Sequence, residues 1–161
     1  MKTPDMKWIH TLVFVLFASV MTQAQSNYFA AYSHYQVIKN EREKIGKEVY
    51  EFRSNVTEMN LKILQFQIKK SIAVLEKEPN FNNDSTFKKA ALNLFGYYLK
   101  VSTDQYARIL KLVEDPELDN DEYRKQLDAI YKELSELGKP FDQAFFKEEE
   151  IFTQKYGIKI E

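Results

Sequence analysis

The chain contains 161 residues, has no cysteine and carries a formal net charge of −1. This near-neutral balance argues against a nucleic-acid-binding protein, which would contact phosphates through a strongly basic face. The absence of cysteine excludes disulfide bonds, cysteine catalysis and any lipid anchor that is attached to a cysteine thiol.

The first 24 residues have the three-part pattern of an export signal. Two lysines precede a mostly apolar run over residues 8–20, and a small-residue site ends at Ala24, where a signal peptidase is expected to cut. The apolar run is shorter than the ~20 residues that a transmembrane helix needs, so a cleaved signal explains it better than a retained anchor. We therefore predict a signal peptide over residues 1–24 and an exported domain over residues 25–161, periplasmic or extracellular and without a membrane anchor.

Apolar residues recur every three or four positions in four stretches of the predicted mature chain, which is the spacing of one helix face. Three stretches cover residues 27–53, 57–77 and 85–114, and the fourth starts near Asn120. Few glycines and prolines interrupt them, and no segment alternates polar and apolar residues for long enough to form a strand. The break at Ser54 contains no glycine or proline, so a single long helix through the first two stretches is the alternative.

Each apolar stripe has to be buried against another helix, because a lone helix would leave it in water. Short connections make successive helices antiparallel. We therefore predict an all-α fold, an up-down-up-down antiparallel four-helix bundle that follows the signal peptide. Pro140 lies inside the fourth pattern and cannot donate a backbone hydrogen bond, so we expect a kink or a brief interruption there. The stripe of this fourth helix consists of Tyr123, Leu127, Ile130, Leu134, Leu137 and Phe141.

Groups suited to catalysis or metal binding are scarce after residue 24. His34 is the only histidine there, and it lies near the predicted new N-terminus, where a helix frays. No Glu-x-x-His pair for a di-metal centre is present, and the third and fourth stretches contain no histidine or methionine that could ligate haem. We interpret the glutamates at 148–150 as a solvated helix face and the acidic segment 115–122 as helix caps, because the glycine of a calcium loop is missing. The sequence thus predicts a protein that is not an enzyme and uses no metal or cofactor.

Aromatic residues, at 14% of the chain, are the least ordinary part of the composition. Tyr97-Tyr98 and Phe145-Phe146 are adjacent pairs, so both members of a pair cannot face the same core seam. One member of each pair is then the better candidate for contact with a ligand or partner, because these side chains offer a large contact area. The alternative is that the tyrosines pack the bundle while their hydroxyl groups reach solvent. The candidate contact residues are Tyr97, Tyr98, Phe145 and Phe146.

Three segments carry a resemblance to a known family. They are Tyr35-x-x-Ile38-x-x-Glu41-x-x-Lys44-Ile45, Ala90-Ala91-Leu92-x-Leu94-Phe95-x-Tyr97-Tyr98 and Phe152-x-x-Lys155-Tyr156-Gly157-Ile158-Lys159-Ile160. In these segments the chain resembles the leptospiral-type surface-protein family of small helical envelope proteins, which is also found in Bacteroidetes. The resemblance implies a helical bundle in a bacterial envelope and brings no catalytic residues. Some members look like lipoproteins, from which this chain differs by lacking the cysteine.

These observations predict an exported, non-enzymatic helical-bundle protein of the bacterial envelope that acts as a binding or structural module. Its partner is expected to be an unidentified envelope protein or a small ligand. The alternative function is that of a small-molecule carrier with an aromatic-lined groove between helices.

Overall fold

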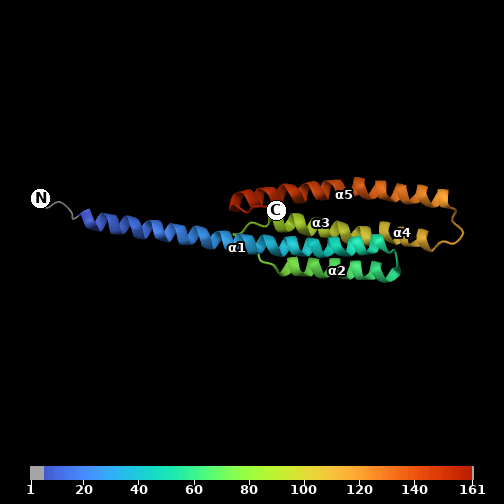
Figure 1. Cartoon of the computed structure of the whole chain (residues 1–161), viewed down its shortest axis with the longest axis horizontal. Helices are drawn as coiled ribbons and strands as arrows, with labels where there is room; N and C mark the ends of the chain where they lie inside the picture. Colours follow the sequence, from blue (N-terminus) through green and yellow to red (C-terminus); the bar gives the residue numbers. More distant parts are fainter. Residues whose placement is uncertain (1–5, 161) are drawn as a thin grey trace.

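The computed structural model describes residues 6–160, with side chains from residue 27 onward (Figure 1). These residues form five helices: α1 (Met6–Ser54), α2 (Glu58–Lys77), α3 (Thr86–Thr103), α4 (Gln105–Glu114) and α5 (Asn120–Tyr156). Residues 6–160 contain no strand, and their β-type pairing is limited to an isolated bridge between Phe81 and Asp84. The all-α prediction is therefore confirmed.

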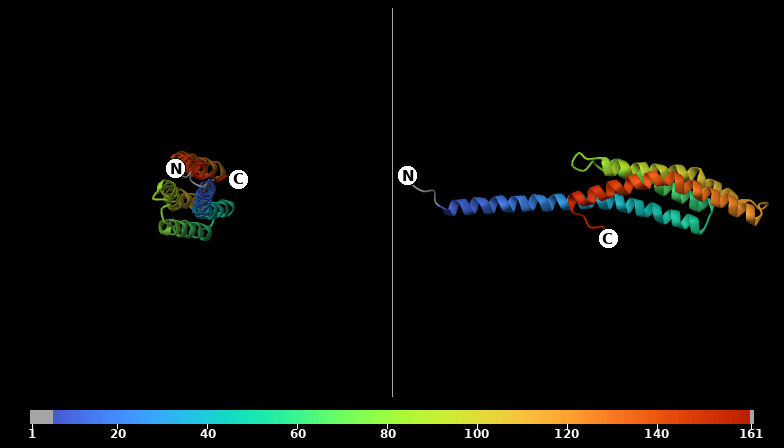
Figure 2. Two further views of the ribbon diagram at one scale, coloured as in Figure 1. Left: turned by 90° about the vertical axis from the view of Figure 1, so that its left-hand side faces the viewer. Right: turned by 90° about the horizontal axis from the view of Figure 1, so that it is seen from above.

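Neighbouring helices pack side by side. α1 lies against α2, α2 against α3, and α3 against α5, while α4 continues beyond the end of α3 (Figures 1 and 2). Contacts between α1 and α5 are sparser than the contacts within those three pairs. One side of the molecule, where α1 and α5 face each other, is therefore packed less tightly than the others.

α1 is longer than predicted, because it begins at Met6 rather than near residue 27. Its N-terminal part extends beyond the ends of the other helices (Figure 1). No proline or glycine lies between residues 6 and 45, so nothing in the local sequence ends the helix near residue 27. The predicted signal falls in this part of α1 and its cleavage stays a prediction; residues 1–5 lie outside the described residues. Among the described residues, no helix combines the length and hydropathy that crossing a membrane requires.

The break predicted at Ser54 is present, and the alternative of one continuous helix is wrong. α1 ends at Ser54, and Thr57 caps the start of α2, where its Oγ1 accepts a hydrogen bond from the backbone N of Asn60 at 3.2 Å. The Asn60 side chain donates in turn to the carbonyl of Asn55 at 2.7 Å. A threonine N-cap satisfies a backbone donor that the first helical turn leaves unpaired, and so fixes where α2 begins.

The third predicted helix, over residues 85–114, is divided at Asp104, so the prediction of one continuous helix is wrong there. The hydroxyl groups of Ser102 and Thr103 donate to backbone carbonyls of the preceding turn at 2.7 and 2.8 Å. Such hydroxyl groups compete with the backbone donors of the helix and bend or end it. Asp104 adopts φ −114° and ψ −79°, and α4 starts at the next residue.

α5 begins at Asn120, as predicted, and Asp119 caps it. Asp119 Oδ1 accepts hydrogen bonds from the backbone N atoms two and three residues later, both at 2.9 Å, which confirms a helix cap in the acidic segment. The helix continues through Pro140, so a local interruption is wrong, and the right-hand view of Figure 2 shows α5 gently bowed. Glu136 and Pro140 are both exposed, so the carbonyl that loses its helical donor to the proline lies on the solvent side.

The apolar stripe of α5 departs from its predicted positions beside Pro140. Leu137 and Phe141 are 42% and 36% exposed, whereas Gly138 and Phe145 are buried. α5 therefore packs on α3 through the small surface of Gly138, and the two larger side chains lie at the edge of that contact. Sequence spacing alone does not reveal that Gly138, rather than Leu137, lies on the buried face of α5.

One apolar core runs through the helices. At one end Phe87 of α3 packs against the rings of Phe145 and Phe152 of α5, with centroids 5.6 and 5.2 Å apart. The largest fully buried apolar side chains are Phe52, Phe95, Phe145, Ile38, Ile45, Leu64, Ile68, Leu75, Leu94 and Ile109. They come from all the helices, so the core joins the predicted stripes into a single unit.

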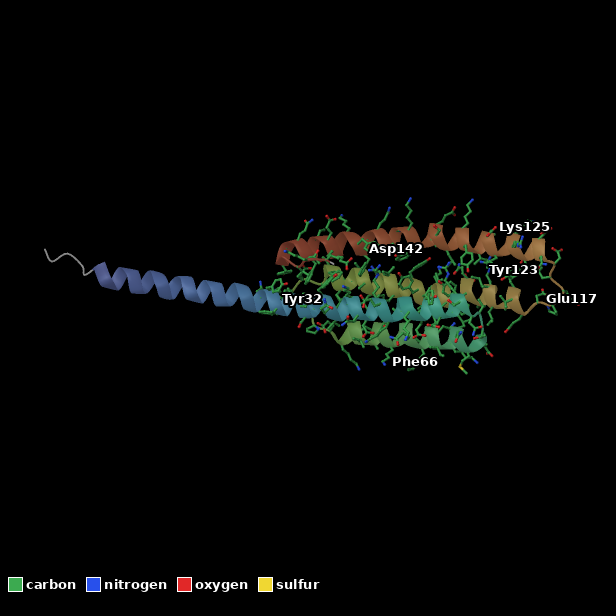
Figure 3. The ribbon with its side chains drawn as sticks, in the orientation of Figure 1. Tyr32, Phe66, Glu117, Tyr123, Lys125 and Asp142 are labelled. Carbon is green, nitrogen blue, oxygen red and sulfur yellow. The ribbon has the colours of Figure 1, made fainter. Side chains whose placement is uncertain are left out.

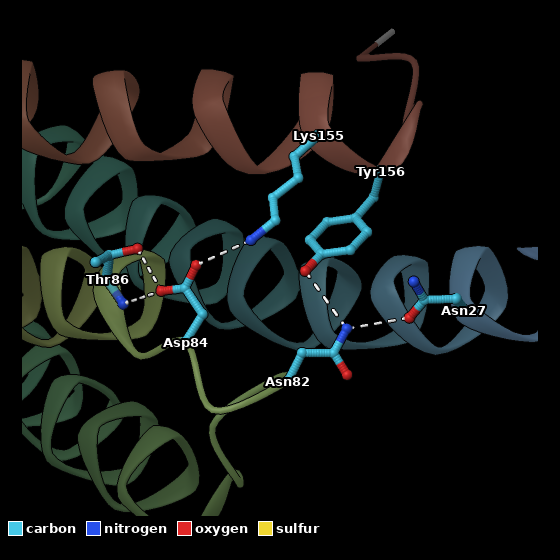
Figure 4. A network of polar contacts seen from close by, with 6 residues as sticks. All are labelled: Asn27, Asn82, Asp84, Thr86, Lys155 and Tyr156. Atoms are coloured by element: carbon cyan, nitrogen blue, oxygen red, sulfur yellow. Dashed lines mark hydrogen bonds and ion pairs between the residues drawn. The ribbon is translucent and has the colours of Figure 1, made fainter.

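The loop between α2 and α3 joins the middle of α1 to the C-terminal end of α5 (Figure 4). Asn82 Nδ2 donates to Asn27 Oδ1 of α1 at 3.1 Å and reaches the hydroxyl of Tyr156 of α5 at 3.5 Å. Asn82 and Asn83 have φ values of 49° and 61°, a left-handed conformation that asparagine tolerates better than most residues. The loop conformation thus brings one amide within reach of two helices.

Asp84 closes the same loop. Its Oδ1 accepts hydrogen bonds from the backbone N and the hydroxyl of Thr86 at 2.9 and 2.7 Å, and Lys155 Nζ lies 3.5 Å from Oδ2 (Figure 4). The two bonds from Thr86, with a smaller contribution from Lys155, hold the pKa of Asp84 below its ordinary value. The ionised carboxylate is therefore the form that the loop stabilises.

Candidate functional site

Two adjoining cavities lie along the side of the molecule where α1 and α5 face each other. One has a volume of about 650 Å³ and is lined mainly by α3 and α5, and the other, of about 500 Å³, is lined mainly by α1. Tyr98, Tyr106 and Phe146 line both cavities, which therefore form one groove that we call the aromatic groove. The groove follows from the packing, because α1 packs mainly on α2 and α5 packs mainly on α3, whereas α1 has few contacts with α5 or α3.

Gly46 leaves part of the α1 wall of the aromatic groove without a side chain. It lines the smaller cavity, and a Cβ built at this position would meet no atom within 4 Å. The space beside α1 is therefore open at this point. A Cβ at Gly46 displaces no neighbour, which makes this position of the groove wall useful for experiments with larger residues.

Three of the four candidate contact residues line the aromatic groove. Tyr98 and Phe146 line both cavities, and Tyr97 lines the larger one. Phe146 is 47% exposed, whereas Tyr97 and Tyr98 are half-buried. Phe145 is fully buried in the core, so its selection as a contact residue is corrected. Of the phenylalanine pair, only Phe146 is placed to touch a ligand.

Tyr97 joins α3 to α5 beside the larger cavity. Its hydroxyl donates to the carbonyl of Leu134 at 2.8 Å, and its ring stacks on Phe141 with centroids 4.9 Å apart. Gly138 permits this approach, because a Cβ there would lie only 2.9 Å from the Tyr97 hydroxyl oxygen. Burial is the main cause that raises the pKa of Tyr97 to about 12. The neutral hydroxyl therefore serves the contact between the helices.

Two arginines of α1 supply positive charge to the aromatic groove. The Arg42 guanidinium carbon lies 4.7 Å from the ring centroid of Phe146, and that of Arg53 lies 5.2 Å from the centroid of Tyr131. Within residues 27–160 neither guanidinium forms an ion pair with a carboxylate at 4.0 Å or less. Stacking on aromatic rings orients both groups, and their donors can still bond an acceptor in the groove.

Burial changes the ionisation of the groups around Arg42. It is the main cause that raises the pKa of Tyr98 to about 12, with a further rise from the charge of Asp142 and an opposing effect of Arg42. Burial also raises the pKa of Glu149, again against the charge of Arg42. Glu149 is only 7% exposed, so the interpretation of the glutamate run as a solvated face is wrong for this residue. The groove therefore contains the hydroxyl group of Tyr98 and the carboxyl groups of Asp142 and Glu149 beside the cationic guanidinium of Arg42.

His34 belongs to a buried contact outside the aromatic groove. It is 4% exposed, and its Nδ1 lies 2.9 Å from Glu78 Oε1, so the side chain is packed in the bundle. The rings of Phe81 and Phe152 lie 5.8 and 5.6 Å from the imidazole centroid. The contact joins α1 to the end of α2 and to α5, and gives His34 a structural role.

Glu41 is a second buried polar residue that the sequence analysis did not single out as a site. It is 5% exposed, its Oε2 accepts a hydrogen bond from Ser71 Oγ of α2 at 2.7 Å, and Lys44 bonds its Oε1. Gln67 Nε2 donates to Ser71 Oγ at 3.0 Å and completes the cluster. A buried carboxylate with these partners fixes the register of α2 along α1.

The side chains that line the aromatic groove offer several kinds of non-covalent contact. The described residues contain no group of three or more histidine, cysteine, aspartate or glutamate side chains placed to hold a metal ion. Aromatic faces, tyrosine hydroxyl groups and two guanidinium groups suit stacking, cation–π contacts and hydrogen bonds to acceptors.

Comparison with known proteins identifies no relative. No protein-family model matches the chain, and neither a curated protein nor a solved structure matches it at a significant level. The resemblance to the leptospiral-type surface-protein family therefore stays a prediction that rests on three sequence segments.

Proposed function

We propose that this protein is an exported, non-enzymatic helical-bundle protein of the bacterial envelope and that it binds a small ligand in the aromatic groove. The observation that carries the proposal is the lining of both cavities, of about 650 and 500 Å³, by Tyr98, Tyr106 and Phe146. Sites for small molecules are concave, mostly apolar and roughly 300–1,000 Å³ in volume. The proposal combines the binding module expected from the sequence with its alternative, a carrier with an aromatic-lined groove.

Export and topology rest on separate arguments. The basic start, apolar run and small-residue site of residues 1–24 support export. The short loops between successive helices support an up-down-up-down order in the mature bundle. All lining residues of the aromatic groove lie between Tyr35 and Ile160, so ligand binding does not depend on where the signal is cut.

The positions of the two arginines suggest the shape of the ligand. Arg42 and Arg53 are eleven positions apart, which places them on one side of α1 and roughly 16 Å apart along its axis. The aromatic residues shared by the two cavities lie in the groove between α1 and α5. We propose an elongated ligand with a flat or apolar body that stacks on these rings and an acidic or other acceptor group that bonds a guanidinium.

A thermal-shift screen with lipids, quinones and aromatic carboxylates tests ligand binding. Gly46→Leu fills the groove wall, and Gly96→Leu is its matched control, because a Cβ at Gly96 also meets no atom within 4 Å and Gly96 does not line the aromatic groove. We expect a ligand to raise the Tm of the wild type and of Gly96→Leu but not of Gly46→Leu. Equal shifts in all three proteins, or no shift with any compound, would count against the proposal.

Cell fractionation followed by N-terminal sequencing tests export. We expect the protein outside the cytoplasm with Gln25 as its first residue. A cytoplasmic protein that keeps Met1 would contradict this part of the proposal and leave the groove experiment valid.

A further inference from the structure

The outward face of α2 carries a row of large apolar side chains. Met59, Ile63 and Phe66 are 66%, 42% and 68% exposed. Their spacing of four and three positions places them along one line of the helix. Phe66 points away from the other helices at the edge of the molecule (Figure 3). α2 packs against α1, α3 and α4 and does not contact α5, so this face covers no other described part of the chain.

Lysines flank this apolar row. Lys62, Lys69, Lys70 and Lys77 are exposed, and Lys70 follows Phe66 by four positions on the same line of the helix. α2 also contains Glu58 and Glu76, of which Glu58 pairs with Lys62 at 2.7 Å. The helix therefore has a positive excess although the whole chain has a formal net charge of −1. An apolar row with flanking lysines is the arrangement of helices that lie in the surface of a bilayer.

We propose that the outward face of α2 docks the protein on the surface of a bilayer that contains anionic phospholipids. The helix lies flat along one edge of the molecule, so its length of roughly 30 Å can rest parallel to the bilayer plane. Met59, Ile63 and Phe66 enter the boundary between headgroups and acyl chains, and the lysines reach the phosphate groups. The aromatic groove lies between α1 and α5, away from this face, and stays open to solvent when the protein is docked.

Co-sedimentation with vesicles tests the proposal. Protein purified from cells that express the full chain is mixed with phosphatidylcholine vesicles and with vesicles that contain about 30 mol% phosphatidylglycerol. We expect stronger binding to the anionic vesicles, and a loss of that binding as salt screens the lysines. Phe66→Gln should weaken binding roughly tenfold. Lys69→Gln combined with Lys70→Gln should weaken it roughly 25-fold.

Matched variants on α5 control for the apolar and the charge changes. Ile151 is 48% exposed and Lys132 and Lys147 are exposed; α5 lies on the opposite side of the molecule from Phe66, as the position of Lys125 in Figure 3 shows. Ile151→Gln and the double change Lys132→Gln, Lys147→Gln should bind like the wild type. All variants carry the same residues 1–24, so any contribution of that segment cancels in the comparison.

Three results would overturn the proposal. The first is equal binding of the wild type to neutral and anionic vesicles, and the second is equal binding by Phe66→Gln and Ile151→Gln. The third is the absence of vesicle binding together with a photo-crosslink from position 66 to a protein, which would identify a protein partner for the α2 face. Circular dichroism with a thermal melt verifies that each variant is folded, as expected for changes at exposed positions.

Discussion

The contact between Tyr97 and Gly138 gives the sharpest prediction for how α5 is held on α3. In Gly138→Ala the new Cβ lies 2.9 Å from the hydroxyl oxygen of Tyr97 and 3.2 and 3.3 Å from two ring carbons. The Tyr97 side chain therefore has to move away from Gly138, which breaks its hydrogen bond to the Leu134 carbonyl and its stacking on Phe141. The substitution should therefore destabilise the protein although alanine is the better helix former.

The magnitude follows from three contributions. Losing the hydrogen bond of Tyr97 costs about 1 kcal/mol, and losing the ring stacking costs about another 1 kcal/mol. Replacing a helical glycine by alanine returns about 1 kcal/mol. Gly138→Ala should thus be less stable than the wild type by about 1 kcal/mol. Gly96→Ala, where a Cβ meets no atom within 4 Å, should be more stable by about 1 kcal/mol.

Urea denaturation of the wild type, both alanine variants, Tyr97→Phe and the double variant measures these differences. Tyr97→Phe removes the hydroxyl oxygen, which is the atom nearest to the new Cβ. Gly138→Ala should therefore lower the free energy of unfolding less in the Tyr97→Phe background than in the wild type. Equal stabilisation by Gly138→Ala and Gly96→Ala, or additive effects of Gly138→Ala and Tyr97→Phe, would refute the reasoning.

Three further predictions concern single polar groups. Ser71→Ala removes a donor from buried Glu41 and should lower the free energy of unfolding by about 1–3 kcal/mol in urea denaturation, whereas an unchanged midpoint would contradict a structural role for the cluster. The pKa of Asp84 is lowered in the folded protein, so its hydrogen bonds stabilise the fold at pH values above the ordinary pKa of 3.8. This stabilisation is lost as the pH falls below that value. The Tm of Asp84→Ala, which is lower than that of the wild type at neutral pH, should therefore approach it in acid. The pKa of Tyr98 is raised from 10.0 to about 12, so the burial of its neutral hydroxyl group contributes stability below pH 10 that is lost as the pH rises from 10 to about 12. The Tm of Tyr98→Phe should therefore fall less than that of the wild type over this pH range.

Local signals predicted the helix boundaries that depend on neighbouring residues. Thr57 and Asp119 cap α2 and α5 near the predicted starts, because an N-cap acts through backbone atoms two or three positions away. The sequence did not predict the break at Asp104. Serine and threonine, the residue types at positions 102 and 103, also occur inside continuous helices, so their presence does not by itself indicate a helix end. Pro140 does not interrupt α5, because solvent can hydrate the exposed carbonyl of Glu136, which loses its helical hydrogen bond to the proline.

The buried polar residues show where prediction from the sequence ends. Glu41 and Glu149 fall at helical spacing between apolar residues of α1 and α5, which is a signal for burial that the sequence analysis did not use. The groups that act on them lie on other helices: Ser71 of α2 bonds Glu41, and the charge of Arg42 of α1 acts on Glu149. No local pattern specifies such pairs. The groove residues are similar: the adjacent pairs indicated that one aromatic ring faces outward, but only the packing of α1 and α5 identifies Phe146 as that ring.

Native mass spectrometry of the protein isolated from its own cells tests ligand binding in the aromatic groove most directly. We predict that the wild type and Gly96→Leu carry a bound small molecule of the same mass and that Gly46→Leu has lost it. Equal occupancy in Gly46→Leu and Gly96→Leu, or a wild type that carries no such molecule under conditions that preserve its fold, would contradict a ligand-binding role for the aromatic groove.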